Sequence, residues 1–304
     1  MTRIVRMFVA TLASHAGLSA AVLADARAAL AAIGADVGET RPLDPPHAVD
    51  IPFAGVSPQA ARSALEAAAG SYDVFVQPDG EARTKHLLVA DMDSTIIGQE
   101  CIDELADFAG RKAEVAAITE RAMRGELDFA SALAGRVAVL AGLPENAIAR
   151  TLAERVRLNP GAATLVGTFR ARGGTTVLIS GGFTVFTQPV ARAAGFDRQV
   201  ANRLVIADGR LAGRVEQPIV DAAVKRATLV AERERLGLTA AQTLAIGDGA
   251  NDIPMLEEAG LGIAFHAKPR AAAAADAAVR FGDLATILWA LGVPRRQWVS
   301  AGQG

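Results

Sequence analysis

Hydrophobic and polar positions in the first 84 residues follow alternating strand and helix periods, which predicts a small unit of its own. Ser57 followed by Pro58 is typical of a helix N-terminus, because serine caps the first turn and proline fits the first helical position. Apolar runs that predict strands lie at residues 4–12, 47–53 and about 74–76, and helical spacing is found at residues 19–33 and 58–69. The order of these elements predicts a ferredoxin-like βαββαβ domain over residues 1–84, for which a regulatory role is a hypothesis.

From Lys85 onward the pattern changes to short apolar strands separated by helices. Residues 86–90 form an apolar run that ends in Asp91, which is typical of a buried parallel strand. An almost purely helical stretch follows, from about residue 100 to 171. Further strands are expected at residues 175–179, 203–205, 211–215, 243–246 and 262–265, with helices after residues 182 and 251, at 221–236 and at the end of the chain. This alternation predicts a doubly wound parallel α/β domain over residues 85–304, with a helical insertion after its first strand.

Composition narrows the class of protein. The 304 residues hold 31 Lys and Arg against 33 Asp and Glu, a net charge of −2, so a basic field for nucleic acid is lacking. The single cysteine, Cys101, excludes an intrachain disulfide and favours a reducing compartment, which makes the cytoplasm the expected location. No apolar run reaches the ~18 residues of a membrane span, so we expect no membrane association. Arg3 and Arg6 faintly resemble the start of a signal peptide, but the interrupted apolar run after them favours a first strand.

Three predicted strands of the second domain end in polar residues. Asp91 and Asp93 follow the first strand, and Asp248 follows a later one. Since the carboxyl ends of parallel strands meet at one crevice, we expect these carboxylates to converge and to offer the oxygen ligands that Mg²⁺ prefers. The simpler alternative is that Asp93 caps a following helix through Ser94 and Thr95.

The third polar strand end is Ser180-Gly181-Gly182, which precedes a predicted helix. Exposed N–H groups and a hydroxyl in that setting can hold a phosphate, although two glycines are also typical of an ordinary tight turn. Lys225 lies on the predicted helix at 221–236, where a lysine is ordinarily a surface residue.

Four ordered segments together resemble the motifs of the haloacid dehalogenase superfamily of phosphatases, and the run from Asp91 through Leu105 resembles more narrowly the phosphoserine phosphatases within it. The segments are Asp91-Met92-Asp93-Ser94-Thr95, Ser180-Gly181-Gly182, Lys225, and Gly247-Asp248-Gly249-Ala250-Asn251-Asp252. The resemblance implies Mg²⁺-dependent hydrolysis of O-phospho-L-serine to L-serine and phosphate, the last step of serine biosynthesis, through an aspartyl-phosphate. It also implies that the helical insertion is a cap.

The resemblance assigns a role to each position. Asp91 would be the nucleophile and Asp93 the acid and base. Mg²⁺ would be held by Asp91, the backbone carbonyl of Asp93, and Asp248. The phosphoryl group would meet Ser180, the amides near Gly181 and Gly182, and Lys225. Asn251 is placed with the substrate-binding residues and, together with Asp252, would orient Lys225.

The resemblance also implies three residues that select the substrate. Glu100 would hold an ammonium group and Arg136 a carboxylate, with Phe129 as the apolar residue between them. Two alternatives stay open here: Glu100 could cap a helix, and Arg136 could point into solvent. Two other functions also stay open, a phosphatase or phosphotransferase on another small phosphorylated metabolite and an amino-acid-sensing regulatory protein. The expected partner is a small molecule, and a homodimer is left open.

Overall fold

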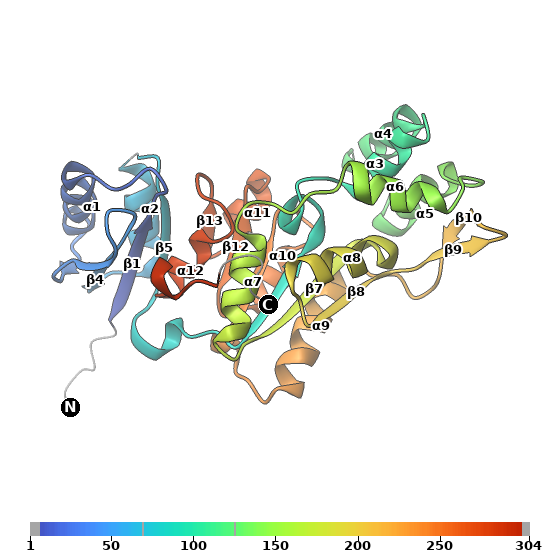
Figure 1. Ribbon diagram of the computed structural model, residues 1–304. Coiled ribbons are helices and arrows are strands. Elements are labelled where there is room, and N and C mark those ends of the chain that lie inside the picture. The colour runs from blue at the N-terminus through green and yellow to red at the C-terminus, as the bar shows by residue number, and fades with distance from the viewer. Residues whose placement is uncertain (1–6, 69, 125, 300–304) are drawn as a thin grey trace.

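The computed structural model describes residues 7–68, 70–124 and 126–299. Within these ranges the chain forms a mixed α/β fold around one long sheet, with a group of helices projecting from one end (Figure 1). The expected strand at 4–12 is found from residue 8 onward, and its first three residues lie outside the described ranges. None of the helices in the described part combines the length and the apolar character that crossing a bilayer requires.

The N-terminal part follows the order of elements that the sequence predicts. Ser57 Oγ accepts the N–H of Ala60 at 3.2 Å and Pro58 opens the helix, as expected from its cap sequence. The elements are β1 (Phe8–Ala13), α1 (Ala20–Ala32), β2 (Asp36–Val37), β3 (Arg41–Asp44), β4 (Ala48–Ala54), α2 (Pro58–Ala67) and β5 (Asp73–Pro78). β1 pairs antiparallel with β4 and β5, and the two helices cover an apolar cluster around Leu30 and Phe53.

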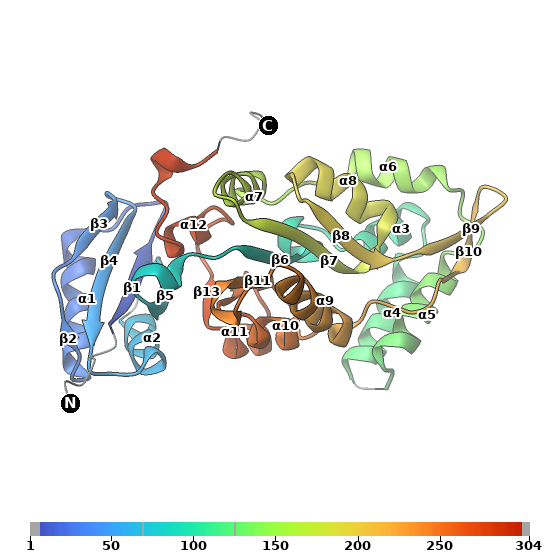
Figure 2. The ribbon, with the colours of Figure 1, turned by 90° about the horizontal axis from the view of Figure 1, so that it is seen from below.

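The second part contains the parallel strands. They are β6 (Leu87–Asp91), β7 (Thr175–Phe183), β8 (Arg198–Asn202), β11 (Thr243–Gly247), β12 (Gly262–Phe265) and β13 (Ala277–Val279). The helices beside them are α7 (Ala162–Ala171), α8 (Thr184–Ala194), α9 (Ala222–Arg235), α10 (Ile253–Glu258), α11 (Pro269–Ala274) and α12 (Thr286–Ala290). Figure 2 shows α7 and α8 on one face of the sheet and α9 to α11 on the other. Both faces of the central strands are therefore buried, which explains their continuous apolar sequence.

The projecting group consists of α3 (Cys101–Phe108), α4 (Lys112–Met123), α5 (Phe129–Val139) and α6 (Asn146–Glu154). A separate hairpin of β9 (Leu204–Ala207) and β10 (Arg210–Val215) packs against α5 (Figure 1). The sequence places α7 within the same helical insertion, but α7 packs against strand β7 of the sheet and against helix α8 beside it. The projecting group is thus α3 to α6 together with the hairpin.

Two strands of the second part, β8 and β13, are absent from the sequence prediction, as are the short strands β2 and β3 of the N-terminal part. β8 reads Arg-Gln-Val-Ala-Asn at the edge of the sheet and has no apolar run, and β13 has three residues within alanine-rich sequence that reads as helix. β13 matters most, because it pairs antiparallel with β5 through Ala278 and Val74 and so joins the two parts into one sheet. The strand order of this sheet is β2-β4-β1-β5-β13-β12-β11-β6-β7-β8, and β3 pairs with β4.

A buried polar network holds the two parts of the sheet together. Arg83 pairs with Asp50 of β4 and donates to the backbone carbonyls of Trp289, at 3.1 Å, and Ala290, at 3.2 Å. Thr11 Oγ donates to Asp50 at 2.7 Å. Asp73 at the start of β5 accepts backbone N–H groups from residues 280, 281 and 282 at 2.7, 3.1 and 2.8 Å. The N-terminal part is therefore tied to the rest by charged hydrogen bonds as well as by strand pairing.

We expect Arg83→Ala to lower the free energy of unfolding by about 3–5 kcal/mol, because Asp50 would keep a buried charge without its partner. Arg41→Ala removes a more exposed pair, with Asp79, and should cost no more than about 1 kcal/mol. Urea unfolding of both variants measures the difference. Equal losses would mean that the Arg83 network does not stabilise the junction.

Candidate active site

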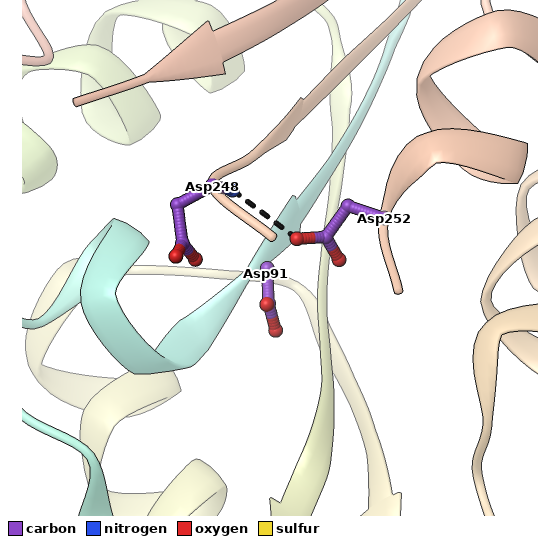
Figure 3. A group of neighbouring side chains, drawn as sticks. All are labelled: Asp91, Asp248 and Asp252. Atoms are coloured by element: carbon purple, nitrogen blue, oxygen red, sulfur yellow. Dashed lines mark hydrogen bonds between the residues drawn. The ribbon is translucent and has the colours of Figure 1, made fainter. Parts of the chain in front are cut away.

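Three neighbouring parallel strands deliver polar side chains to one edge of the sheet. β6 ends at Asp91, β7 carries Ser180 near its end, and Asp248 directly follows β11. β6 lies between the other two, and both pairings are parallel, so the three carboxyl ends meet. Figure 3 shows Asp91, Asp248 and Asp252 side by side at this edge.

A buried lysine joins two of these carboxylates. Lys225 Nζ lies 2.7 Å from Asp91 Oδ1 and 2.7 Å from Asp252 Oδ1, and the lysine side chain is 1% exposed. Burial by itself lowers the pKa of Lys225, but the two carboxylates outweigh burial and raise this pKa above its ordinary value. The pKa of Asp91 is raised well above its usual range, first by burial and then by the charge of Asp252, while Lys225 opposes both. Lys225 therefore stays charged and offsets part of the crowded negative charge.

Asp252 also shapes the loop that follows β11. Its Oδ2 accepts the backbone N–H groups of Asp248 at 3.1 Å and Gly249 at 3.0 Å. A Cβ atom at Gly247 would lie 2.5 Å from Asp252 Cγ, so this position requires glycine. Asn251 lies in the same loop, with its Oδ1 beside Gly249. Both oxygens of Asp252 are thus occupied, one by the lysine and the other by the loop.

Asp93 lies in a tight turn, residues 92–96, in which Ser94 has a left-handed φ of 54°. Asp93 Oδ1 accepts the N–H of Cys101, the first residue of α3, at 2.9 Å. Its Oδ2 accepts Ser180 Oγ–H at 2.9 Å. The carboxylate therefore caps α3 from a distance, instead of capping through Ser94 and Thr95, and also contacts the end of β7.

The Ser180–Gly182 segment is folded tightly against Asp93. Gly182 N–H donates to Ser180 Oγ at 2.8 Å, and a Cβ at Gly182 would lie 2.9 Å from Asp93 Oδ2. A Cβ at Gly181 would lie 3.2 Å from the ring of Phe129, the first residue of α5. Glycine at these positions allows the projecting helices to approach the strand end closely.

Glu100 occupies the N-cap position of α3 without making a capping hydrogen bond. Its Oε1 instead accepts Ser94 Oγ–H at 2.8 Å. Solvent still reaches part of the residue, but burial of the carboxyl group, followed by the charge of Asp93, raises the pKa of Glu100 to about 7. The helix-capping alternative therefore does not account for Glu100.

Arg136 lies seven residues beyond Phe129 on α5, so the two positions share a face of that helix. The arginine is half-buried, and its Nε donates to the carbonyl of Ala132 at 3.4 Å. Burial raises the pKa of Asp103 on α3, and the charge of Arg136 opposes that shift. Within the described residues no hydrogen bond joins Arg136 to the strand ends. The ring of Phe129, by contrast, lies 3.2 Å from where a Cβ atom at Gly181 would be.

A model of the haloacid dehalogenase-like hydrolases matches residues 88–257, which include these strand ends and the projecting helices. The chain belongs to this family. It is 46% identical to a phosphoserine phosphatase of Mycobacterium tuberculosis over 257 residues, which are 84% of this chain and 63% of the relative. It therefore spans less than two thirds of that protein's length.

Solved structures of similar proteins extend this family likeness. A probable phosphoserine phosphatase of Vibrio cholerae, in unliganded form, matches with a TM-score of 0.75 and 32% identity over 96% of this chain and 88% of that one. A phospho-aspartyl intermediate analogue of phosphoserine phosphatase matches with a TM-score of 0.63 and 37% identity over 68% of this chain and 98% of that one.

The cluster of carboxylates at the strand ends suits a hard divalent cation. Carboxylate oxygens of Asp91, Asp248 and Asp252 lie within 4.8 Å of one another, and all three residues are buried. Because the oxygens of Asp252 are taken by Lys225 and the loop, Asp91 and Asp248 are the better ligands. Burial and the charge of Asp252 raise the pKa of Asp248. A bound cation would relieve this crowding of negative charge.

Several polar residues that support the site have no such role predicted from the sequence. Thr95 is buried and its Oγ1–H donates to Asp248 Oδ1 at 3.2 Å, while Asn159 Nδ2 donates to the carbonyl of Thr95 at 2.7 Å. Lys268 Nζ lies 3.9 Å from Asp248 Oδ2. Thr95 belongs to a recognised motif, but the partner of a single threonine or asparagine depends on contacts distant in sequence and carries no local signal.

We expect Asp252→Asn to lower the free energy of unfolding by about 1–3 kcal/mol, because one amide oxygen cannot accept the three donors that now contact Asp252. Asp276→Asn is the matched control, since Asp276 accepts a single N–H, from Gly262, and an amide oxygen can replace it. Chemical unfolding of both variants measures the costs. A loss for Asp252→Asn no larger than for Asp276→Asn would contradict the assigned bonds.

Proposed function

We propose that this protein hydrolyses O-phospho-L-serine to L-serine and phosphate in a Mg²⁺-dependent reaction, the last step of serine biosynthesis. The observation that carries the proposal is the placement of two different carboxylates at one strand end. Asp91 is held by a buried ammonium group, and Asp93 is hydrogen-bonded to Ser180. Family membership and the names of the similar proteins support phosphoserine as the substrate.

In the first half-reaction Asp91 attacks phosphorus. Its Oδ1 accepts hydrogen bonds from Lys225 and from the N–H of Met92, at 2.7 and 2.8 Å, so Oδ2 is the oxygen that attacks. A bond forms between Asp91 and phosphorus while the bond from phosphorus to the serine oxygen breaks, and Asp93 gives that oxygen a proton. The products of this step are serine and an aspartyl-phosphate.

In the second half-reaction Asp93 acts as the base. It takes a proton from a water molecule whose oxygen bonds to phosphorus, and the bond from phosphorus to Asp91 breaks. Lys225, Ser180 and the amides of Gly181 and Gly182 would contact the other phosphoryl oxygens, with Asn251 beside them and Asp252 orienting the lysine. These fixed charges and donors stabilise the charge of the transition state, which dominates catalysis of phosphoryl transfer.

Asp91, Asp248 and the backbone carbonyl of Asp93 would hold Mg²⁺. The ion would neutralise phosphoryl charge and orient the phosphate for in-line attack. Glu100 would bind the ammonium group of the substrate and Arg136 its carboxylate, with Phe129 covering the apolar part. The ring of Phe129, which lies where a Cβ atom at Gly181 would meet it, and the position of Glu100 at the start of α3 support this arrangement.

We propose two domains, residues 1–84 and 85–304. The separate apolar cluster of the N-terminal part supports the division. We assign α3 to α6 to a cap that closes over the crevice and excludes bulk water, since these helices pack on one another and α7 packs on the sheet. The substrate is a small molecule, and the single cysteine supports a cytoplasmic location. A homodimer stays a prediction.

Asp91→Asn should lower phosphate release from phosphoserine by at least ~10⁴-fold, because an amide is not an anionic nucleophile. Asp93→Asn should lose proton transfer in both half-reactions and fall ~10²- to 10⁴-fold. Asp25→Asn, an exposed change on α1, should leave the rate unchanged. Phosphate release by purified, folded variants measures all three. Near-normal turnover by Asp91→Asn would exclude the covalent route.

Arg136→Ala should lower kcat/KM for phosphoserine ~30-fold to several thousand-fold, because a charge-assisted contact with the substrate carboxylate is worth ~2–5 kcal/mol in a closed site. Hydrolysis of p-nitrophenyl phosphate, which lacks a carboxylate, should fall much less. Arg150→Ala on α6 is the control among the cap arginines. The ratio of kcat/KM for the two substrates cancels any loss of active enzyme. Equal losses on both substrates would place Arg136 outside carboxylate recognition.

A further inference from the structure

The last residue of β8 connects two segments of the proposed site. Asn202 is 2% exposed, and its Nδ2 donates to the carbonyl of Gly181 at 2.8 Å. Its Oδ1 accepts the N–H of Val220 at 2.7 Å, and Nδ2 also lies 3.5 Å from the carbonyl of Val220. Gly181 belongs to the proposed phosphate loop, and Val220 directly precedes Asp221, the N-cap of α9.

A side-chain amide matches these partners in both its donor and its acceptor. The contacts of Asn202 are one N–H group and two carbonyl groups, so the side chain must accept on one atom and donate from the other. An ionised aspartate could accept but not donate, and an apolar side chain could do neither. Because the position is buried, any partner left unbonded would keep the cost of its desolvation.

Peptide geometry carries the effect of Asn202 to Asp93. The carbonyl of Gly181 and the N–H of Gly182 belong to one planar peptide unit, so fixing the direction of the carbonyl also fixes the direction of the N–H. That N–H donates to Ser180 Oγ at 2.8 Å, and Ser180 Oγ–H donates to Asp93 Oδ2 at 2.9 Å. Asn202 therefore influences the proposed acid and base through one peptide and one hydroxyl.

The contact of Asn202 with Val220 affects the position of Lys225. Val220 fixes the start of α9, whose Asp221 caps the helix by accepting Val224 N–H at 2.9 Å, and Lys225 follows in the next turn. Holding Gly181 and Val220 on one amide fixes the spacing between the phosphate loop and the helix that carries the ammonium group. We propose that Asn202 is a positioning residue for phosphoryl transfer, which rests on the proposed function and adds to it a residue that does not contact the substrate.

Asn202→Ala removes both contacts and should lower kcat ~10- to 100-fold, because small displacements of catalytic groups are costly. Inhibition by inorganic phosphate should weaken as well, about tenfold, since phosphate would bind the same loop and lysine. Thr187→Val is the matched control: it removes a buried hydrogen bond between α8 and Gln199 of β8, away from the site. Its kcat should stay within about threefold of the wild type when each variant is assayed well below its unfolding temperature.

Asn202→Asp provides a test that loss of stability alone would not imitate. A protonated aspartic acid has the shape of asparagine and can donate to the Gly181 carbonyl, whereas the ionised form repels it. If the introduced carboxyl group ionises within the tested range, we expect the kcat of the variant, relative to that of the wild type, to rise as pH falls from 9.5 to 5.5. If this group stays protonated throughout, we expect the kcat of the variant to stay near that of the wild type. If Asn202→Ala does not fold, a rise of relative kcat at low pH supports the inference, and a deficit of about tenfold or more that is flat with pH overturns it.

Three results would overturn the inference. They are an Asn202→Ala variant within threefold of wild type, a Thr187→Val variant with an equal loss, and an Asn202→Asp deficit that is flat with pH and as large as that of alanine. If the wild type releases phosphate from p-nitrophenyl phosphate but not from phosphoserine, the proposed substrate is wrong. The same comparison run with the aryl ester would still decide the role of Asn202.

Discussion

The site is organised around the buried ammonium group of Lys225, which lies between Asp91 and Asp252. Three carboxylates meet at one edge of the sheet, and bringing them together without a cation would be costly. Lys225 offsets part of this charge and contacts Oδ1 of Asp91, the oxygen that also accepts the N–H of Met92. Asp252 completes the arrangement, because its second oxygen holds the backbone after β11 and so places Asp248.

The remaining supports of the site follow from the parallel sheet. Each strand end is followed by a short loop that a polar side chain holds: Asp252 acts from within the loop after β11, whereas Asn159 for the turn after β6 and Asn202 for the end of β7 come from other parts of the chain. Glycines at 181, 182 and 247 let these loops and the projecting helices approach one another more closely than a side chain would allow. The N-terminal part does not supply these side chains, but it continues the sheet that places them and is tied to it through Arg83 and Asp73.

The strands of the sheet differ in how well the local sequence predicts them. The central strands were predictable because they are buried on both faces and read as continuous apolar runs. β8 and β13 were not, because an edge strand needs no apolar run and a three-residue strand is defined by its neighbours rather than by its own sequence. Likewise α7 continues the helical pattern of the insertion, and only its packing on β7 and α8 separates it from the projecting helices α3 to α6.

The sequence by itself determined the order of the main helices and central strands, the parallel α/β class and the identity of the polar strand ends. Periodicity, helix caps and motifs depend on residues that are close together in the sequence. The tertiary structure decided which oxygen of Asp91 is free, that Asp93 reaches Cys101 and Ser180, that Glu100 bonds to Ser94 instead of capping α3, and that Asn202 bridges Gly181 and Val220. Most of these contacts join residues that are not adjacent in the sequence, such as Asp93 and Ser180, which are 87 positions apart. Their partners are chosen by where the folded sheet places them, which no local pattern of residues specifies.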